Sequence, residues 1–299
     1  MSRALDVCVF ARADRCSTRQ PHARFAPALT HSSLLCTHSS LMTQNAFKDH
    51  FSAIAGAYAA ARPEYPDALF DAIAAQVPAD ATVWEPGCGS GQATRGLAAR
   101  FARVHASDPS VKQLEQHWAH EASLHGEGTV SLSVAPGERS DLADASVQLI
   151  AVAQALHWFD RERFFAECER VLAPRGVLAV WAYGDFLPPP GMEVAVADLR
   201  ARIDEFWQRE NAEVRAGYPD YQWPFETVPA PSLWLTAQWG LGRFLGYLNS
   251  LSATDRCRAA TGDDPVALNR PALSQAWGMA EDLRTIQWPL TLHLRRKAG

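Results

Sequence analysis

The residues of this chain that could hold a ligand begin with a turn of alternating glycines. Residues 82–91 read Thr-Val-Trp-Glu-Pro-Gly-Cys-Gly-Ser-Gly. They predict a short strand ending at Glu85, followed by a turn containing Gly87, Gly89 and Gly91. Glycine permits a tight turn and carries no Cβ, so the backbone can approach a ligand closely. Apolar residues four apart then predict an amphipathic helix whose N-terminus offers free N–H groups, at Ala93, Leu97 and Phe101.

The spacing of these glycines excludes two common nucleotide sites. The nicotinamide fingerprint Gly-x-Gly-x-x-Gly would need a third glycine at position 92 or 94, which are Gln92 and Thr94. A phosphate-binding P-loop would need Gly-Lys followed by Ser or Thr, and no lysine is near. What is present is an acidic residue followed by Gly-x-Gly-x-Gly.

A second acidic residue follows at the distance of one βαβ step. Residues 104–108 read Val-His-Ala-Ser-Asp and predict a second strand ending at Asp108, which lies 21 residues after Gly87. A carboxylate there could accept hydrogen bonds from both hydroxyls of a ribose, each worth about 1.5–3 kcal/mol when charge-assisted. The alternative is a turn residue before Pro109, or an N-cap for the helix that begins near Val111.

Together these residues resemble motif I and its ribose acid in the class I S-adenosylmethionine-dependent methyltransferases. Two further stretches resemble the type 11 methyltransferase domains, in particular the trans-aconitate methyltransferase-like branch. One is Tyr-x-x-x-Arg-Pro-x-Tyr-Pro, here at residues 58–66, and the other is Ala-Gln-Ala-x-His-Trp-Phe-Asp, here at residues 153–160. Residues 144–150 match as well, except that Gln148 replaces the usual aspartate, which puts local packing in doubt. The resemblance covers about residues 47–297.

The resemblance implies an α/β, Rossmann-like fold. We expect a seven-stranded, mostly parallel sheet with the last strand antiparallel, helices on both faces, and a helical lid inserted after strand five. We expect a cofactor-binding core over residues 42–184, the lid over 185–225, and strands and helices completing the sheet over 226–299. The period-two runs place later strands at 129–134, 147–152, 177–182, 232–237 and 285–294.

The resemblance also implies roles for single residues toward S-adenosylmethionine. Glu85 is expected to orient the amino end of the cofactor or to cap the glycine turn. Gly137 and Glu138 fall where the adenine is contacted, and Gln154 could hydrogen-bond the substrate or the methionine end of the cofactor. Tyr58 and Arg62 could close over the cofactor, with an exposed arginine as the alternative for Arg62. His157 is either a general base or a structural histidine that fixes the Trp158–Phe159 turn.

Bulk properties restrict the partners and the compartment. With a net charge of −5, the chain has no excess of basic residues that would favour nucleic acid as a partner. The longest apolar runs are too short to span a bilayer. Six cysteines without Cys-x-x-Cys or zinc spacing suit a reducing compartment such as the cytoplasm and predict no metal site. Residues 1–41 show no hydrophobic period, so we expect a disordered or misassigned extension.

The expected function is in-line methyl transfer from S-adenosylmethionine to a small molecule, such as a carboxylic acid or another apolar-bodied metabolite. A carboxylate acceptor needs no general base, whereas an amine or hydroxyl can need one. The alternative is a non-catalytic nucleotide-binding or interaction protein on the same scaffold, because a fold does not fix a function.

Overall fold

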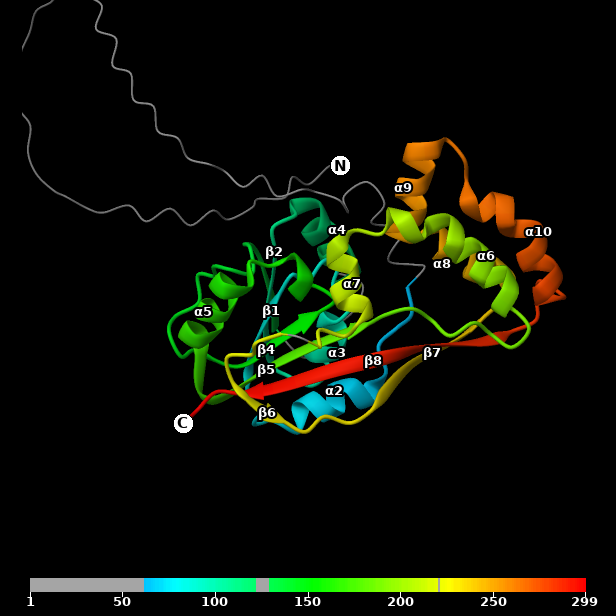
Figure 1. Ribbon diagram of the computed structural model, residues 1–299. Helices are drawn as coiled ribbons and strands as arrows, with labels where there is room; N and C mark the ends of the chain where they lie inside the picture. Colours follow the sequence, from blue (N-terminus) through cyan, green and yellow to red (C-terminus); the bar gives the residue numbers. More distant parts are fainter. Residues whose placement is uncertain (1–61, 122–128, 220) are drawn as a thin grey trace, which may run out of the picture. The chain divides into compact units, whose positions relative to one another are not determined.

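The computed structural model describes residues 62–121, 129–219 and 221–299 (Figure 1). Contacts divide the chain into one unit of residues 1–46 and another of residues 47–299, and every described residue belongs to the second. The expectation for residues 1–41 therefore lies outside the described residues, as does Tyr58. The domain boundaries expected within the second unit stay predictions.

One sheet organises the described residues. Its strand order is β3-β2-β1-β4-β5-β8-β6, and β7 also pairs with β8. The first five strands are parallel, and β8 runs antiparallel to β5, β6 and β7. The strands are β1 (Thr82–Pro86), β2 (Arg103–Asp108), β3 (Thr129–Val134), β4 (Val147–Ala153), β5 (Leu172–Tyr183), β6 (Glu226–Val228), β7 (Leu233–Trp239) and β8 (Arg284–Arg296).

The predicted fold class is confirmed, with one difference at the edge of the sheet. Within the described residues there are eight strands where seven were expected, because the edge position next to β8 is divided between β6 and β7. Thr227 pairs with Arg295, and Leu233 pairs with Leu290 along the same edge of β8. The interruption falls at Pro229 and Pro231, which have no N–H to donate to a ladder.

Helices cover both faces of the sheet because its central strands are apolar on both sides. Alternate residues of β5 enter two different apolar clusters, with Trp181 in one and Val180 in the other. The first cluster includes side chains of α2 (Asp67–Ala74) and α3 (Thr94–Ala98), and the second includes α5 (Arg161–Val171) and α7 (Arg209–Arg215). Helix α4 (Val111–Glu121) contacts β2 and β3.

A group of helices beyond the end of the sheet forms what we call the helical layer, visible around one end of β8 in Figure 1. The layer comprises α6 (Glu193–Ile203), α8 (Leu241–Asn249), α9 (Ser252–Thr261) and α10 (Pro265–Trp277). Helix α6 lies within the segment predicted as a lid, whereas the other three connect β7 to β8, so two separate insertions build this layer. Helix α6 contacts both α9 and α10.

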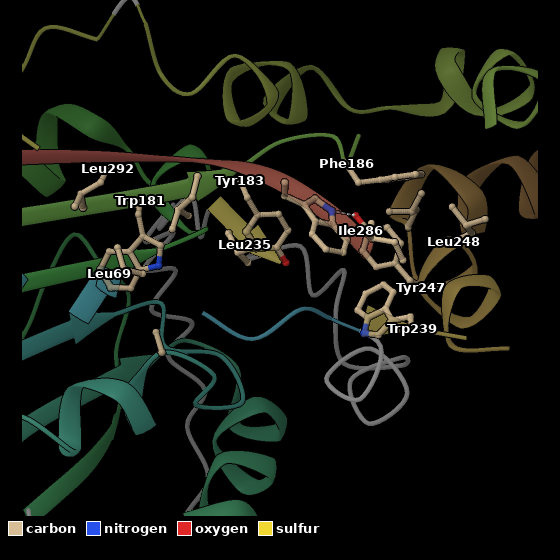
Figure 2. Packing of buried hydrophobic residues seen from close by; sticks show 14 of the residues in the cluster. Leu69, Trp181, Tyr183, Phe186, Leu235, Trp239, Tyr247, Leu248, Ile286 and Leu292 are labelled. Atoms are coloured by element: carbon tan, nitrogen blue, oxygen red, sulfur yellow. Dashed lines mark hydrogen bonds between the residues drawn. The ribbon is translucent and has the colours of Figure 1, made fainter. Parts of the chain in front are cut away.

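Aromatic side chains join the helical layer to the sheet (Figure 2). Phe186, just after β5, packs edge-on against Tyr247 of α8 at a ring separation of 5.7 Å. The indole N–H of Trp288 on β8 donates a hydrogen bond of 2.9 Å to the Tyr247 hydroxyl, and both side chains are buried. This satisfied polar contact fixes the position of α8 relative to the strands.

Two local expectations differ from the structure in instructive ways. The helix after the glycine turn is short, so Phe101 is buried beyond its end instead of on its face. Gln148, the departure from the family pattern, accepts a 2.8 Å hydrogen bond from the Thr82 backbone N–H and so links β4 to the start of β1.

The described residues contain no helix long and apolar enough to cross a membrane.

The helical layer depends on a buried amide between α6 and α10, which gives a first prediction. Asn269 is 4% exposed, donates to the Ala195 carbonyl at 3.0 Å and accepts from the Arg202 guanidinium at 3.0 Å. Asn269→Ala should lower the free energy of unfolding by about 1–3 kcal/mol, because it leaves buried polar groups without partners. Denaturant unfolding measures this. Leu268→Ala, at an exposed position on the same helix, should cost less than about 0.5 kcal/mol, and equal losses would contradict the prediction.

Candidate cofactor and active site

The glycine turn after β1 needs glycine for two distinct reasons. The φ angles of Gly87, Gly89 and Gly91 are +68°, +54° and +83°, which other residues adopt only with strain. At Gly87 and Gly91 there is also no room, because a Cβ would lie 2.7 Å from the Ala155 Cβ and 2.4 Å from the His117 ring. At Gly89 the nearest such atom is 3.9 Å away. Other side chains therefore pack tightly against the turn at Gly87 and Gly91, whereas there is space beside Gly89.

Asp108 lies directly beside this open glycine. The Gly89 N–H donates a 3.0 Å hydrogen bond to one carboxylate oxygen, and the Ser110 N–H donates one of 2.8 Å to the other. The second bond is the local turn contact foreseen as the alternative role for Asp108. The structure therefore gives Asp108 a structural role at the turn, and its ribose role stays a prediction.

The Glu85 side chain links the end of β1 to the start of α3. It is 1% exposed, and its carboxylate accepts a 2.6 Å hydrogen bond from the Thr94 hydroxyl at the start of α3. Burial, and then the charges of Glu85 and Asp108, raise the pKa of the Cys88 thiol well above its usual range. Cys88 therefore stays protonated and is no nucleophile.

Arg62 and Pro63 belong to the motif predicted at residues 58–66, and this segment contacts the glycine turn. The Gln92 amide donates to the Pro63 carbonyl, which ties this segment to the glycine turn. The Arg62 guanidinium contacts the Ser250 carbonyl at 3.5 Å, and its Cζ lies 5.6 Å from the centre of the Tyr247 ring. Arg62 thus lies between the cofactor turn and α8.

Gln154 at the end of β4 has an unusual backbone and a free acceptor. Its φ is +52°, rare for a residue other than glycine and typical of functional sites. Its N–H bonds to the Trp181 carbonyl and its side-chain amide nitrogen to the Tyr183 carbonyl, each at 3.0 Å. The side-chain oxygen is buried and accepts no hydrogen bond from the described residues. An oxygen held in this way suits a ligand's ammonium group.

His157 is placed three residues further on, in the short 3₁₀ turn η1 (Leu156–Trp158). Its Nδ1 lies 3.1 Å from the hydroxyl of Tyr218, a fully buried residue that follows α7. Burial lowers the pKa of His157 to about 3. Such an imidazole is neutral at working pH and a weak proton acceptor, which favours the structural role over that of a general base.

Gly137 and Glu138, expected near the adenine, both contact the protein itself. A Cβ on Gly137 would lie 2.8 Å from the Phe159 ring. One Glu138 oxygen accepts a 2.7 Å hydrogen bond from the Asp160 N–H. These contacts hold the loop after β3 against the turn after β4, and they leave the second carboxylate oxygen of Glu138 for other partners.

Sequence reasoning missed the residues that hold these loops together. Phe159 touches two of the predicted glycines, Gln92 ties Pro63 to the turn, and Tyr247 lies under Arg62. Phe159 was within the motif that carried the resemblance, so the motif was the available signal. The described residues contain no group of three or more His, Cys, Asp or Glu side chains able to hold a metal ion.

Comparison with known proteins gives one consistent result. Residues 84–180 match the model of a methyltransferase domain family. A solved structure described as a "putative type II methyltransferase" from Anaeromyxobacter dehalogenans is 39% identical, covers 80% of this chain and 99% of its own, and superposes with a TM-score of 0.72. A "putative methyltransferase" of Dictyostelium discoideum is 28% identical over 87% of this chain and 99% of its own length. An "uncharacterized methyltransferase" of Mycobacterium tuberculosis is 38% identical over 44% of this chain and 51% of its own.

The fold is an open α/β domain, a class in which ligands bind at the carboxyl ends of the parallel strands. With these matches, the chain belongs to the class I S-adenosylmethionine-dependent methyltransferases. Its cofactor is S-adenosylmethionine. The residues present fit that molecule, since an open glycine, a neighbouring carboxylate and a buried amide oxygen with no partner among the described residues follow the carboxyl ends of three neighbouring strands, β1, β2 and β4.

The contact between Gly89 and Asp108 gives a second prediction. Asp108→Asn removes the charge and one of two acceptor oxygens, so the dissociation constant for S-adenosylmethionine should rise at least about tenfold, as for the loss of one charge-assisted hydrogen bond. Isothermal titration calorimetry on the folded variant measures this. Asp141→Asn, at an exposed acidic position, serves as the control. A change of less than twofold for Asp108→Asn would remove the ribose assignment.

The lowered pKa of His157 gives a third prediction. Between the unfolded pKa of about 6.5 and the folded value of about 3, the unfolded chain binds a proton that the folded chain does not. Stability from this group is therefore present above pH 6.5 and is lost as the pH falls, by at most about 1.4 kcal/mol per pH unit. Denaturant unfolding at pH 7, 5.5 and 4 measures this, and the free energy of unfolding of the wild type should fall more steeply with decreasing pH than that of His157→Gln. Parallel curves of unfolding free energy against pH would contradict the prediction.

Proposed function

We propose that this methyltransferase acts on a small organic acid and forms a methyl ester. When bound, S-adenosylmethionine supplies a methyl group on a sulfonium, whose neutral leaving group makes alignment and exclusion of water the main tasks of the protein. Glu85, Asp108 and Gln154 are the residues that we propose orient the cofactor. We propose that Arg62 positions the methionine end from the side of α8.

The observation that carries the acceptor class is a pocket at the inner side of the helical layer. It is lined largely by apolar side chains of α6 and α8, among them Val196, Leu199 and Leu248, and by Asp185 and Phe186 at the end of β5. Tyr247 belongs to this lining and also lies beneath Arg62, so the pocket adjoins the proposed cofactor site. The free space is about 20 Å³, room for about one water, so an acceptor would have to displace lining side chains. We infer the acceptor class from the character of that lining, since apolar side chains with a few charged groups suit a small organic molecule.

Two arginines line the pocket, and they differ in their pairing. Arg215 is bound to Asp185, with a shortest distance of 2.5 Å. Arg200 donates to the Phe186 carbonyl at 2.7 Å and stacks over the Phe186 ring, but pairs with no acidic side chain of the described residues. Its remaining guanidinium N–H groups can donate two parallel hydrogen bonds to a carboxylate. Arg200 is therefore the residue that we propose anchors the acid.

The state of His157 agrees with an acceptor of this class. An amine or hydroxyl acceptor would need to lose a proton, and an imidazole with a pKa near 3 accepts one poorly. A carboxylate is already ionised at neutral pH and attacks without a base. The proposal thus asks His157 only to hold the turn through Tyr218.

We also propose that the protein works in the cytoplasm. Cys88, Cys168 and Cys257 are buried thiols, and none of the cysteines in the described part of the chain forms a disulfide there. Buried free thiols suit a reducing compartment.

A methyl-transfer screen gives the fourth prediction. Incubation with methyl-labelled S-adenosylmethionine and a panel of small carboxylic acids, amines and alcohols should label an acid, and the label should be released by mild base because the product is an ester. Arg200→Gln should raise the KM for that acid at least about tenfold, the loss of one charged pair, while the dissociation constant of the cofactor stays unchanged.

Arg270→Gln is the matched control, since Arg270 is an exposed arginine on α10 and outside the pocket lining. Labelling of amines or alcohols alone would refute the acid proposal. An equal KM for Arg200→Gln and wild type would refute the role of Arg200.

A further inference from the structure

One aromatic ring touches both loops that were expected to contact the cofactor. The tip of the Phe159 ring, Cζ, lies 3.1 Å from where a Cβ of Gly87 would be and 2.8 Å from where a Cβ of Gly137 would be. Gly87 follows β1 and Gly137 follows β3, and β2 separates these strands in the sheet. The ring therefore lies between two loops that approach each other above the strand ends.

The glycine at 137 is explained by this ring alone. Gly87 has φ +68°, so its backbone angle already favours glycine, whereas Gly137 is outside the left-handed region. A side chain at 137 would be allowed by the backbone and excluded by three Phe159 ring atoms at 2.8–3.0 Å. These distances are shorter than any ordinary carbon contact, so an added methyl would have to displace the ring or the loop.

The ring itself is firmly held. Its centre is 4.8 Å from that of Phe164, a fully buried residue of α5. The Phe159 N–H donates to the Leu156 carbonyl at 3.1 Å. The next residue, Asp160, donates its N–H to Glu138 at 2.7 Å. The segment is thus joined to the loop after β3 by a ring contact and by a charge-assisted hydrogen bond.

We propose that Phe159 is a positioning residue that sets the separation of the glycine turn and the loop after β3, and hence the width of the cofactor site. The proposal rests on the proposed cofactor site and adds a residue that need not touch the cofactor. A shorter side chain at position 159 would leave the two loops without a spacer. Binding of the cofactor would then have to order the loops, and the entropy lost in ordering them would weaken the affinity. The affinity for S-adenosylmethionine should then change more than the turnover at saturation.

A double-mutant cycle tests this spacing, with calorimetric binding of S-adenosylmethionine as the readout. Gly137→Ala alone should weaken binding at least tenfold, because its methyl collides with the ring. Phe159→Leu alone should weaken binding about threefold to tenfold. The double variant should bind at least as well as Phe159→Leu, because the added methyl enters space that the ring has left. In both single variants KM for the cofactor should rise while kcat changes less than threefold.

The control separates spacing from general loss of packing. Phe165→Leu shortens the neighbouring ring, which contacts Phe164 and Trp223 and is not among the atoms near either glycine. It should lower stability to a similar degree as Phe159→Leu, measured by denaturant unfolding, and leave cofactor affinity within twofold.

Three outcomes would overturn the proposal. Multiplicative weakening in the double variant would show that Gly137 and Phe159 act independently. Tighter binding by Phe159→Leu would show that the ring occupies the space of the ligand. Wild-type protein that bound no S-adenosylmethionine would refute the cofactor site itself, whereas wild-type binding with either of the first two results would refute only the role of Phe159.

Discussion

The hydrogen bond from the Gly89 N–H to the Asp108 carboxylate is the contact on which the rest of the site depends. It joins the ends of two adjacent parallel strands, and it forms because β1 and β2 are in register up to Pro86 and Ser107. A shift of one residue would turn Asp108 toward the other face of the sheet. The apolar clusters on both faces fix that register, since the buried Val83 and Val104 must pack together. The packing of the core therefore sets the geometry of a polar contact at its rim.

Much of the fold and part of the site follow from the sequence because the signals are local. A strand shows its period of two within a few residues, and the glycine spacing separates this turn from other nucleotide turns without any tertiary information. The placement of Asp108 needs only the length of one βαβ step. By contrast, the contact of Phe159 with Gly87 and Gly137 joins residues from three different strand ends. It depends on the order of strands in the sheet and on the exact path of η1, neither of which a single sequence displays.

The helical layer shows the same limit in another form. The sequence predicts a helical lid over residues 185–225, but α9 and α10, the partners of its helix α6, come from a second insertion about 50 residues later. Asn269 is an ordinary polar residue in sequence, and only the structure reveals that it satisfies α6 backbone and side chain together. The division of the edge strand was similarly hidden, since Pro229 and Pro231 could equally have ended a loop.

That interrupted edge has a consequence for how molecules of this protein meet. The outer edge of a sheet offers unpaired backbone groups to any passing extended chain. Here β6 has only three residues, and four residues separate it from β7, whose outer face carries the exposed Trp234. An incoming strand would meet two short templates separated by prolines instead of one long ladder. Growth of fibrils by strand addition is thereby disfavoured at the position where an aromatic surface would otherwise promote it.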